Sequence, residues 1–271
     1  MTSSIGTLGH CLSGKTIFLS ASVPAPERDD RFRRVENAHF EIDQAVISLA
    51  RAVFSEGGRL VFGGHPAISP LVAMVAGEYR QPAYAESGEE RPAPLIRIFQ
   101  SRAFEGFLPD DTLMMYRTGY AAITWTEAIG DERFDPGAHY TGPPCPRSLA
   151  AMREAMIEGT QPVAMVCVGG MEGVEQEFEV FRKLRPGIPV YVLEGTGGAA
   201  GLLAERDRDR VRVIDAEIAH TLRRLRADFP AAPRGERPAD EPAPPATPYP
   251  LIMQTLVSEL AGPDSHGMAG M

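Results

Sequence analysis

The chain has 271 residues, with 27 Lys or Arg against 36 Asp or Glu, so its formal charge at neutral pH is −9. This acidic balance argues against a protein that coats nucleic acid, because phosphate binding needs concentrated Lys and Arg. With 44% hydrophobic and 23% charged residues, the composition is typical of a globular protein with a sizeable core. We therefore expect no direct binding of nucleic acid.

Cysteine content and hydropathy predict the compartment. The three cysteines, an odd number in a long chain, do not describe a disulfide framework. The first residues, MTSSIGTLGHCLSGKTIFLS, lack a basic region followed by a long apolar run, so we expect no signal peptide. No segment approaches the roughly 18 apolar residues of a transmembrane helix. The sequence thus predicts a cytoplasmic protein that does not enter a membrane.

Short apolar segments alternate with longer segments of helical periodicity. The segments expected to be strands are 15–20, 59–62, 95–99, 112–115, 121–124, 163–168 and 189–193. The segments expected to be helices are 35–55, 68–77, 147–158, 172–184 and 215–227. Nearly continuous apolar strands that alternate with helices are typical of a parallel sheet covered on both faces. The sequence therefore predicts an α/β fold, a doubly wound, mostly parallel, Rossmann-like sheet.

The composition changes once, near the C-terminus. Between Pro230 and Pro250, eight of 21 residues are proline, which predicts an extended linker. The segment LIMQTLVSELA that follows favours about three turns of helix with one apolar face, which we expect to dock on this chain or on a partner. The expected organisation is an N-terminal extension (1–14), a Rossmann-like domain (15–228), a Pro-rich linker (229–250) and a C-terminal helix and tail (251–271).

Four loops that follow predicted strands are rich in Gly or Ser. They contain Ser20, Ala21 and Ser22; Gly63, Gly64 and His65; Gly169, Gly170, Met171, Glu172 and Gly173; and Gly195, Thr196, Gly197 and Gly198. The carboxyl ends of parallel strands meet at one edge of a sheet, where ligands of such folds bind. Glycine lets a ligand approach the backbone, and amides at a helix N-terminus attract phosphate. The loops predict a nucleotide or phosphosugar site, with simple tight turns as the alternative.

Several common site types are disfavoured. The sequence has no GxxxxGK[ST] motif and no GxGxxG after its first strand, which argues against phosphoryl transfer and hydride transfer. His10 with Cys11, and His139 with Cys145, lack the paired ligands of a zinc site. We therefore expect neither a metal nor a cofactor.

Residues 147–178 read RSLAAMREAMIEGTQPVAMVCVGGMEGVEQEF. This segment resembles the signature of the LOG-type (lysine decarboxylase-like) nucleotide phosphoribohydrolases in the SLOG (SMF/DprA-LOG) superfamily. That signature has an Arg-bearing helix, an apolar strand and then PGGxGTxxE. Arg153 lies 16 positions before Gly169, as the functional Arg of that family does, and Gly169 and Gly170 match its glycine pair. Gly173 and Glu177 match the third glycine and the glutamate if one residue is inserted at 171–172.

The resemblance has departures as well. Val168 stands where that family has Pro, and Val174 stands where it has Thr. The insertion leaves Glu177, Glu175 and Glu172 as alternatives for the functional glutamate. Such changes fit a binding domain of the same superfamily, some members of which sense nucleotide-derived signals, including ADP-ribose-like molecules.

The resemblance implies a nucleotide or ADP-ribose-like ligand and hydrolysis of an N-glycosidic bond in a nucleoside monophosphate or related nucleotide. Glu177, or Glu175 in its place, would be the carboxylate near C1′. Arg153 would orient that glutamate or the ribose, or bind phosphate, and the amides of 170–173 would hold the 5′-phosphate. The plainer interpretation is that the glutamates complement the helix dipole and that Arg153 forms a surface ion pair with Glu154 or Glu158.

Two other functions stay open at this point. One is a non-catalytic sensor of a nucleotide-derived signal, and the other is a nucleoside deoxyribosyltransferase-like enzyme that transfers the sugar to a second base. For either, the expected partner is a nucleotide-type small molecule. The resemblance also implies a homodimer or a higher homo-oligomer.

Overall fold

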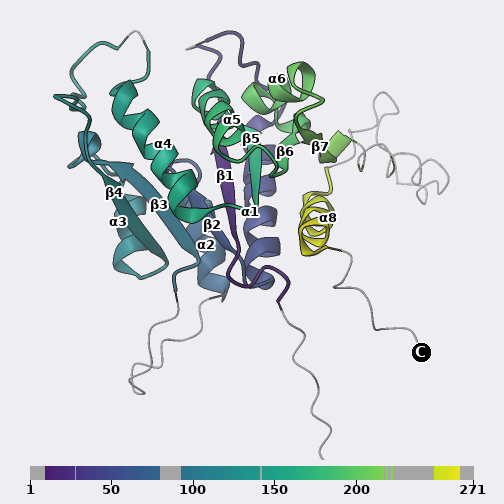
Figure 1. The fold of residues 1–271 in the computed structure, drawn as a ribbon. Helices are drawn as coiled ribbons and strands as arrows, with labels where there is room; N and C mark the ends of the chain where they lie inside the picture. The colour runs from purple at the N-terminus through teal and green to yellow at the C-terminus, as the bar shows by residue number, and fades with distance from the viewer. Residues whose placement is uncertain are drawn as a thin grey trace, which may run out of the picture.

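A computed structural model describes residues 10–27, 29–79, 93–140, 142–216, 218, 221 and 247–262. Within them, seven parallel strands form one sheet in the order β4-β3-β2-β1-β5-β6-β7 (Figure 1). The strands are β1 (Thr16–Ser22), β2 (Arg59–Phe62), β3 (Ile96–Ser101), β4 (Ala121–Thr126), β5 (Ala164–Gly169), β6 (Val190–Leu193) and β7 (Arg212–Val213). The sheet grows in opposite directions from β1 and from β5, so the topological switch point lies between these two strands. The predicted Rossmann-like α/β fold is confirmed.

Helices cover both faces of the sheet (Figure 1). They are α1 (Ala38–Ser55), α2 (Ser69–Tyr79), α3 (Asp110–Arg117), α4 (Pro146–Thr160), α5 (Glu172–Leu184), α6 (Gly198–Arg206) and α8 (Tyr249–Ala261), with short 3-10 helices at η1 (Arg102–Phe104) and η2 (Glu194–Thr196). Side chains alternate along a strand, so Ile17 and Leu19 of β1 join one apolar cluster with α1, α2 and α8. Phe18 joins the other cluster, with α4, α5 and α6. None of the described helices is long and apolar enough to cross a membrane.

The predicted strand at 112–115 is wrong, because these residues belong to α3. Pro109 precedes this helix, and Asp110 and Asp111 in its first turn interact favourably with the helix dipole. Met114 is 64% exposed, whereas a strand inside a parallel sheet would be buried on both faces. A four-residue apolar run could not distinguish these structures.

Neither helix α6 nor strand β7 was predicted from the sequence. Helix α6 follows the fourth glycine-rich loop. Its first seven residues are all Gly, Ala or Leu, so the sequence shows no alternation of polar and apolar residues that would indicate a helix. Strand β7 has only two residues. Most of the helix expected at 215–227 lies outside the described residues, as do residues 1–9 of the expected extension and 229–246 of the expected linker.

Helix α8 packs against α1 of the same chain, as the tail helix was expected to do on this chain or a partner (Figure 1). Its buried face carries Tyr249, Ile252, Met253, Leu256 and Val257. At its end, Glu259 Oε2 accepts hydrogen bonds from Tyr191 Oη at 3.0 Å and from Arg212 Nη1 at 2.9 Å. The helix is therefore part of the core.

Two leucines of α8 allow a matched test of this packing. Leu256 is 0% exposed and Leu251 is 50% exposed. We expect Leu256→Ala to lower the free energy of unfolding by about 2–5 kcal/mol, because it leaves a cavity between α8 and α1. Leu251→Ala should change it by about 0.5 kcal/mol or less. Urea denaturation measures both; equal effects would show that α8 is not docked.

Candidate functional site

Three polar side chains meet at the carboxyl edge of the sheet, beside the switch point. Ser20 comes from β1, Arg153 from α4 and Glu177 from α5. Ser20 Oγ donates a hydrogen bond of 2.5 Å to Glu177 Oε2, and Arg153 Nε lies 3.6 Å from Glu177 Oε1. The Arg153 and Glu177 side chains are only 9% and 15% exposed. The structure thus brings these three predicted side chains together.

The packing of α5 explains why a carboxylate is buried here. Val174, Phe178 and Phe181 form its apolar face against the sheet, and Glu177 lies next to Phe178 on this face. Burial raises the pKa of Glu177, although the positive charge of Arg153 and the hydrogen bond from Ser20 oppose this rise. A carboxyl group of raised pKa is suited to acid–base chemistry near neutral pH.

Helix α4 carries Arg153, and Glu132 of the segment after β4 fixes where this helix begins. Glu132 accepts hydrogen bonds from the backbone N–H groups of Ser148 at 2.7 Å and Arg147 at 3.2 Å. Ser148 Oγ in turn accepts from Ile129 N–H at 2.9 Å. Burial alone would raise the pKa of Glu132, but the hydrogen bonds from Ser148 and Arg147 outweigh it and lower this pKa to about 2. Glu132 thus acts as an anionic cap.

The third glycine-rich loop is shaped by its glycines. Gly169 and Gly170 have φ of 57° and 87°, and a Cβ at Gly170 would lie 2.3 Å from Val174 Cγ2. Their amides are used inside the chain: Gly169 N–H donates to Thr196 Oγ1 and Gly170 N–H to Ser22 O, each at 2.7 Å. The glycine pair therefore builds the turn that leads into α5.

The first turn of α5 is open to an anion. Its N-cap residue Met171 makes no side-chain cap. Within the described part of the chain, no hydrogen bond engages the amides of Glu172 and Gly173. A Cβ at Gly173 would lie 3.6 Å from Arg153 Nη2, so a guanidinium stands beside these amides. Free amides, helix dipole and guanidinium together favour negative charge at this point.

The fourth glycine-rich loop (195–198) packs against the third (169–173). Thr196 is 0% exposed and donates from Oγ1 to Leu193 O at 2.7 Å. Gly197 and Gly198 are also buried, and their N–H groups donate to Glu194 O and Arg33 O, each at 3.0 Å. The structure thus places these three predicted ligand-binding residues in internal contacts.

A buried aspartate that was not predicted from the sequence, Asp215, anchors this loop. Asp215 is 3% exposed and accepts from Glu194 N–H at 3.0 Å and Gly195 N–H at 2.6 Å. Burial raises the pKa of Asp215 against these hydrogen bonds. No signal in the sequence connects Asp215 with a turn some 20 residues before it.

The second loop lies on the other side of β1. Gly64 has φ of 74°, and a Cβ there would lie 2.9 Å from Gln100 Nε2, which donates to the carbonyl oxygen of Gly63. Gly63 and His65 are half-buried, as are Ala21 and Ser22 at the end of β1. Gln100 was not predicted from the sequence. Its position as a polar residue near the end of the apolar strand β3 is the signal that could have identified it.

The alternatives for the functional glutamate separate in the structure. Glu175 Oε1 pairs with Arg206 Nη1 at 3.0 Å, and its Oε2 lies 3.6 Å from Arg31 Nη1. Glu172 is exposed and accepts from the Gln176 amide at 2.8 Å. The Glu175 and Glu177 side chains are similarly buried, at 13% and 15% exposed, but only Glu177 contacts Arg153. Arg153 pairs with neither Glu154 nor Glu158.

Comparison with known proteins identifies the family. The sequence pattern of the SLOG cluster3 family matches residues 32–224, well over half of the chain. The chain belongs to the SLOG cluster3 family. One similar solved structure is the X-ray structure of TM1055, a structural genomics target, at 14% identity over 70% of this chain and 81% of that chain, with a TM-score of 0.42. No curated protein matches.

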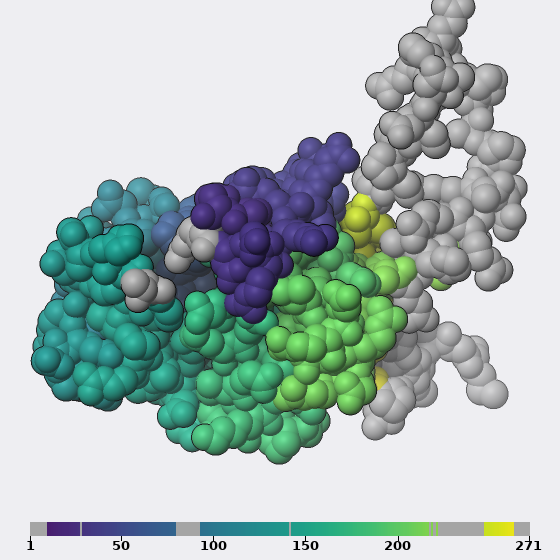
Figure 2. Space-filling model, turned by 90° about the horizontal axis from the view of Figure 1, so that it is seen from above, coloured from purple at the N-terminus to yellow at the C-terminus, as the bar shows by residue number. Residues whose placement is uncertain are grey.

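The surface of this SLOG domain is hollowed at the carboxyl edge. Figure 2 looks onto this edge and shows a hollow between the loop after β1 and the segment after β4. In the part of the chain that the structure describes, no three His, Cys, Asp or Glu side chains gather closely enough to hold a metal ion.

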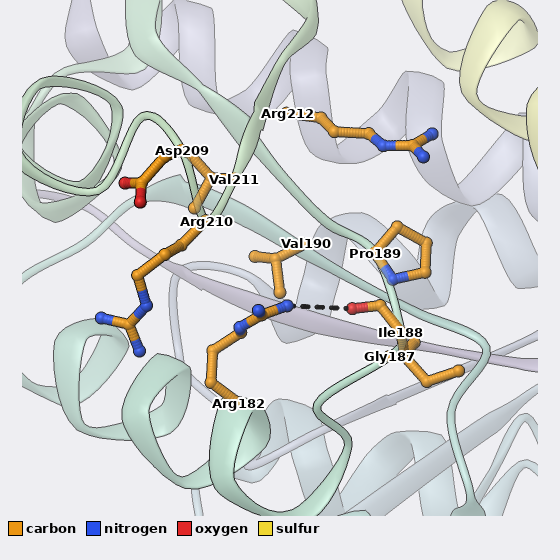
Figure 3. A pocket seen from close by; sticks show the side chains of 9 residues that line it. All are labelled: Arg182, Gly187, Ile188, Pro189, Val190, Asp209, Arg210, Val211 and Arg212. Atoms are coloured by element: carbon orange, nitrogen blue, oxygen red, sulfur yellow. Dashed lines mark hydrogen bonds between the residues drawn. The ribbon is translucent and has the colours of Figure 1, made fainter.

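A cavity of about 210 Å³ lies elsewhere, at the start of β6 and β7 (Figure 3). Among its lining residues, Arg210 pairs with Glu179 and Asp207, and Arg212 pairs with Glu259. Arg182 also lines this cavity and donates to Ile188 O at 3.4 Å. The carboxyl edge is the stronger candidate site, because it gathers Ser20, Arg153 and Glu177, which the sequence predicted.

The cap on α4 predicts a pH dependence. The pKa of Glu132 is lowered in the folded state to about 2, against about 4.3 for an unfolded chain. Its stabilising effect is therefore complete above about pH 5 and is lost as the pH falls toward about 2. We expect the difference in unfolding free energy between the wild type and Glu132→Gln to shrink over this range. Glu127→Gln, at an 83% exposed position of the same segment, is the control; a constant Glu132→Gln difference would contradict the cap.

The contact between the third and fourth glycine-rich loops leaves no room for a side chain at position 198. Gly198 has φ of 57°, and a Cβ there would lie 2.4 Å from Gly170 O and 2.6 Å from Pro24 Cγ. We expect Gly198→Ala to destabilise the protein by about 2 kcal/mol or more, measured by thermal unfolding. Gly187→Ala, where no atom lies within 4 Å of the new Cβ, should have little effect. Similar melting temperatures for the two variants would refute this packing.

Proposed function

We propose that this SLOG protein binds a nucleotide or ADP-ribose-like ligand at the carboxyl edge between β1 and β5, and hydrolyses its N-glycosidic bond. The observation that carries the proposal is the buried contact of Glu177 with Ser20 and Arg153 beside the open first turn of α5. A family match supports the ligand class, because the SLOG cluster3 pattern over residues 32–224 includes Arg153, Glu177 and the first turn of α5.

The two halves of the site suit the two halves of a nucleoside monophosphate. Its phosphate would accept from the amides of Glu172 and Gly173 and from Arg153 Nη2, which lies beside Gly173. Its ribose would then lie over the end of β1, with C1′ facing Glu177. The base would extend toward the second loop, where Gly63 and His65 are half-buried.

The chemistry follows from one buried carboxylate. Breaking the C1′–N bond sends its electron pair to the base and leaves positive charge on the sugar, which the Glu177 carboxylate stabilises. Water adds its oxygen to C1′ while Glu177 accepts the proton, which then passes to the departing base. The products are the free base and ribose 5-phosphate. Arg153 and Ser20 hold Glu177 in place throughout.

A non-catalytic sensor is the second candidate, and a specific observation favours it. Both oxygens of Glu177 are already engaged, Oε2 by Ser20 and Oε1 by Arg153. Val174 is 4% exposed and packs in the core, so no hydroxyl reaches the first turn of α5 from this position. A sensor would bind the same ligand and release no base.

We further infer a cytoplasmic location. Cys11, Cys145 and Cys167 are all free thiols, which is usual in a reducing compartment. The homodimer or higher homo-oligomer implied by the family resemblance belongs to the same proposal, and light scattering tests it.

Incubation with nucleoside monophosphates, NAD and ADP-ribose, followed by chromatography for released base, tests the function. We expect Glu177→Gln to lower turnover by about 10²-fold or more, because it removes the proton acceptor, while ligand-induced thermal stabilisation persists. Glu158→Gln, an exposed change on α4, should leave turnover unchanged.

Three other results have distinct meanings. Thermal stabilisation by a ligand without release of base would favour the non-catalytic sensor over the hydrolase. Transfer of the sugar to a second base would indicate a deoxyribosyltransferase-like reaction. Undiminished turnover in Glu177→Gln would remove Glu177 from the mechanism.

A further inference from the structure

We infer that Gln176 is a positioning residue that separates Glu172 from Arg153 and so keeps the guanidinium available to the phosphate of the ligand. The inference rests on the proposed function, because it concerns the same anion-binding turn of α5. Gln176 was not among the residues predicted from the sequence, and its role follows from two hydrogen bonds that its side-chain amide makes.

The amide forms a bridge between a cation and an anion. Arg153 Nη1 donates to Gln176 Oε1 at 2.8 Å, and Gln176 Nε2 donates to Glu172 Oε1 at 2.8 Å. A guanidinium only donates and a carboxylate only accepts, so the two partners fix which way the amide points. Glutamine is suited to this bridge because its side chain both accepts and donates.

Without the hydrogen bond to Gln176, the Glu172 carboxylate could itself occupy the anion-binding first turn of α5. Glu172 is the first residue of α5, and its side chain is exposed and therefore able to move. The first turn attracts negative charge, and the Arg153 side chain is 9% exposed, with no partner for Nη2 among the described residues. Glu177 lies beside Nε of this guanidinium, and a direct pair with Glu172 would occupy the remaining Nη2 and place a second carboxylate where the phosphate belongs.

Helix geometry holds the carboxylate away from that position. Residues 172 and 176 are one turn apart on the same face of α5, so the hydrogen bond to Gln176 draws the Glu172 side chain along the helix. The same amide fixes the Arg153 guanidinium on its other side. Gln176 therefore sets the preference for a phosphorylated ligand over the same ligand without its phosphate.

Titration calorimetry with adenosine monophosphate and adenosine measures this preference directly. We expect Gln176→Ala to weaken binding of the monophosphate by about tenfold or more, because Glu172 then competes for Arg153. Adenosine binding should change by less than about twofold, since adenosine has no phosphate to place there.

A second substitution separates competition from simple loss of packing. In Gln176→Ala combined with Glu172→Gln, the competing carboxylate is gone, and monophosphate binding should return to within about threefold of the wild type. Glu179→Gln, which removes an exposed charge further along α5, is the control and should not rescue Gln176→Ala. Circular dichroism of each variant verifies that α5 is intact.

The outcomes distinguish this inference from the function on which it rests. Equal weakening of both ligands by Gln176→Ala, no weakening, or failure of the double variant to recover would each overturn the role of Gln176 alone. A wild-type protein that binds neither these ligands nor ADP-ribose would overturn the proposed function, and this inference with it.

Discussion

The buried pair of Arg153 and Glu177 is the interaction on which the arrangement of this site depends. A carboxylate removed from water is costly unless charge and hydrogen bonds compensate it, and here Arg153 and Ser20 supply both. The three residues come from α4, α5 and β1, so their contact exists only when the helices are packed on the sheet. Elements that look peripheral, such as the Glu132 cap on α4, therefore serve to hold this pair in place.

Three glycines of the third and fourth loops, Gly169, Gly170 and Gly198, shape the backbone and do not themselves offer free amides to a ligand. The turn at Gly169 and Gly170 and the packing of Gly198 against it use glycine to bring two backbone segments together. The amides of these three glycines donate to Thr196 Oγ1, Ser22 O and Arg33 O, whereas the free amides belong to Glu172 and Gly173 at the start of α5. The amides that are free to bind a ligand thus lie two and three residues after Gly170, at the N-terminus of α5 and beside Arg153.

The sequence predicted the sheet, most helices and the grouping of the loops, because these depend on hydropathy periodicity and on strand order. It predicted Arg153 and Glu177 through the resemblance, but spacing alone could not exclude Glu175, whose pairing with Arg206 depends on the packing of α6. The apolar segment 112–115 was predicted as a strand because its sequence does not show that Met114 is exposed to solvent on α3, which depends on tertiary packing. Gln176 and Asp215 act through partners distant in sequence, so no local pattern marks them.

A crystal structure of the protein grown with adenosine monophosphate or ADP-ribose would show directly which residues hold the phosphate. We predict a phosphate on the amides of Glu172 and Gly173 within hydrogen-bonding distance of Arg153, with the ribose beside Glu177. A ligand bound instead in the cavity near Arg182, with the first turn of α5 left without an anion, would contradict it.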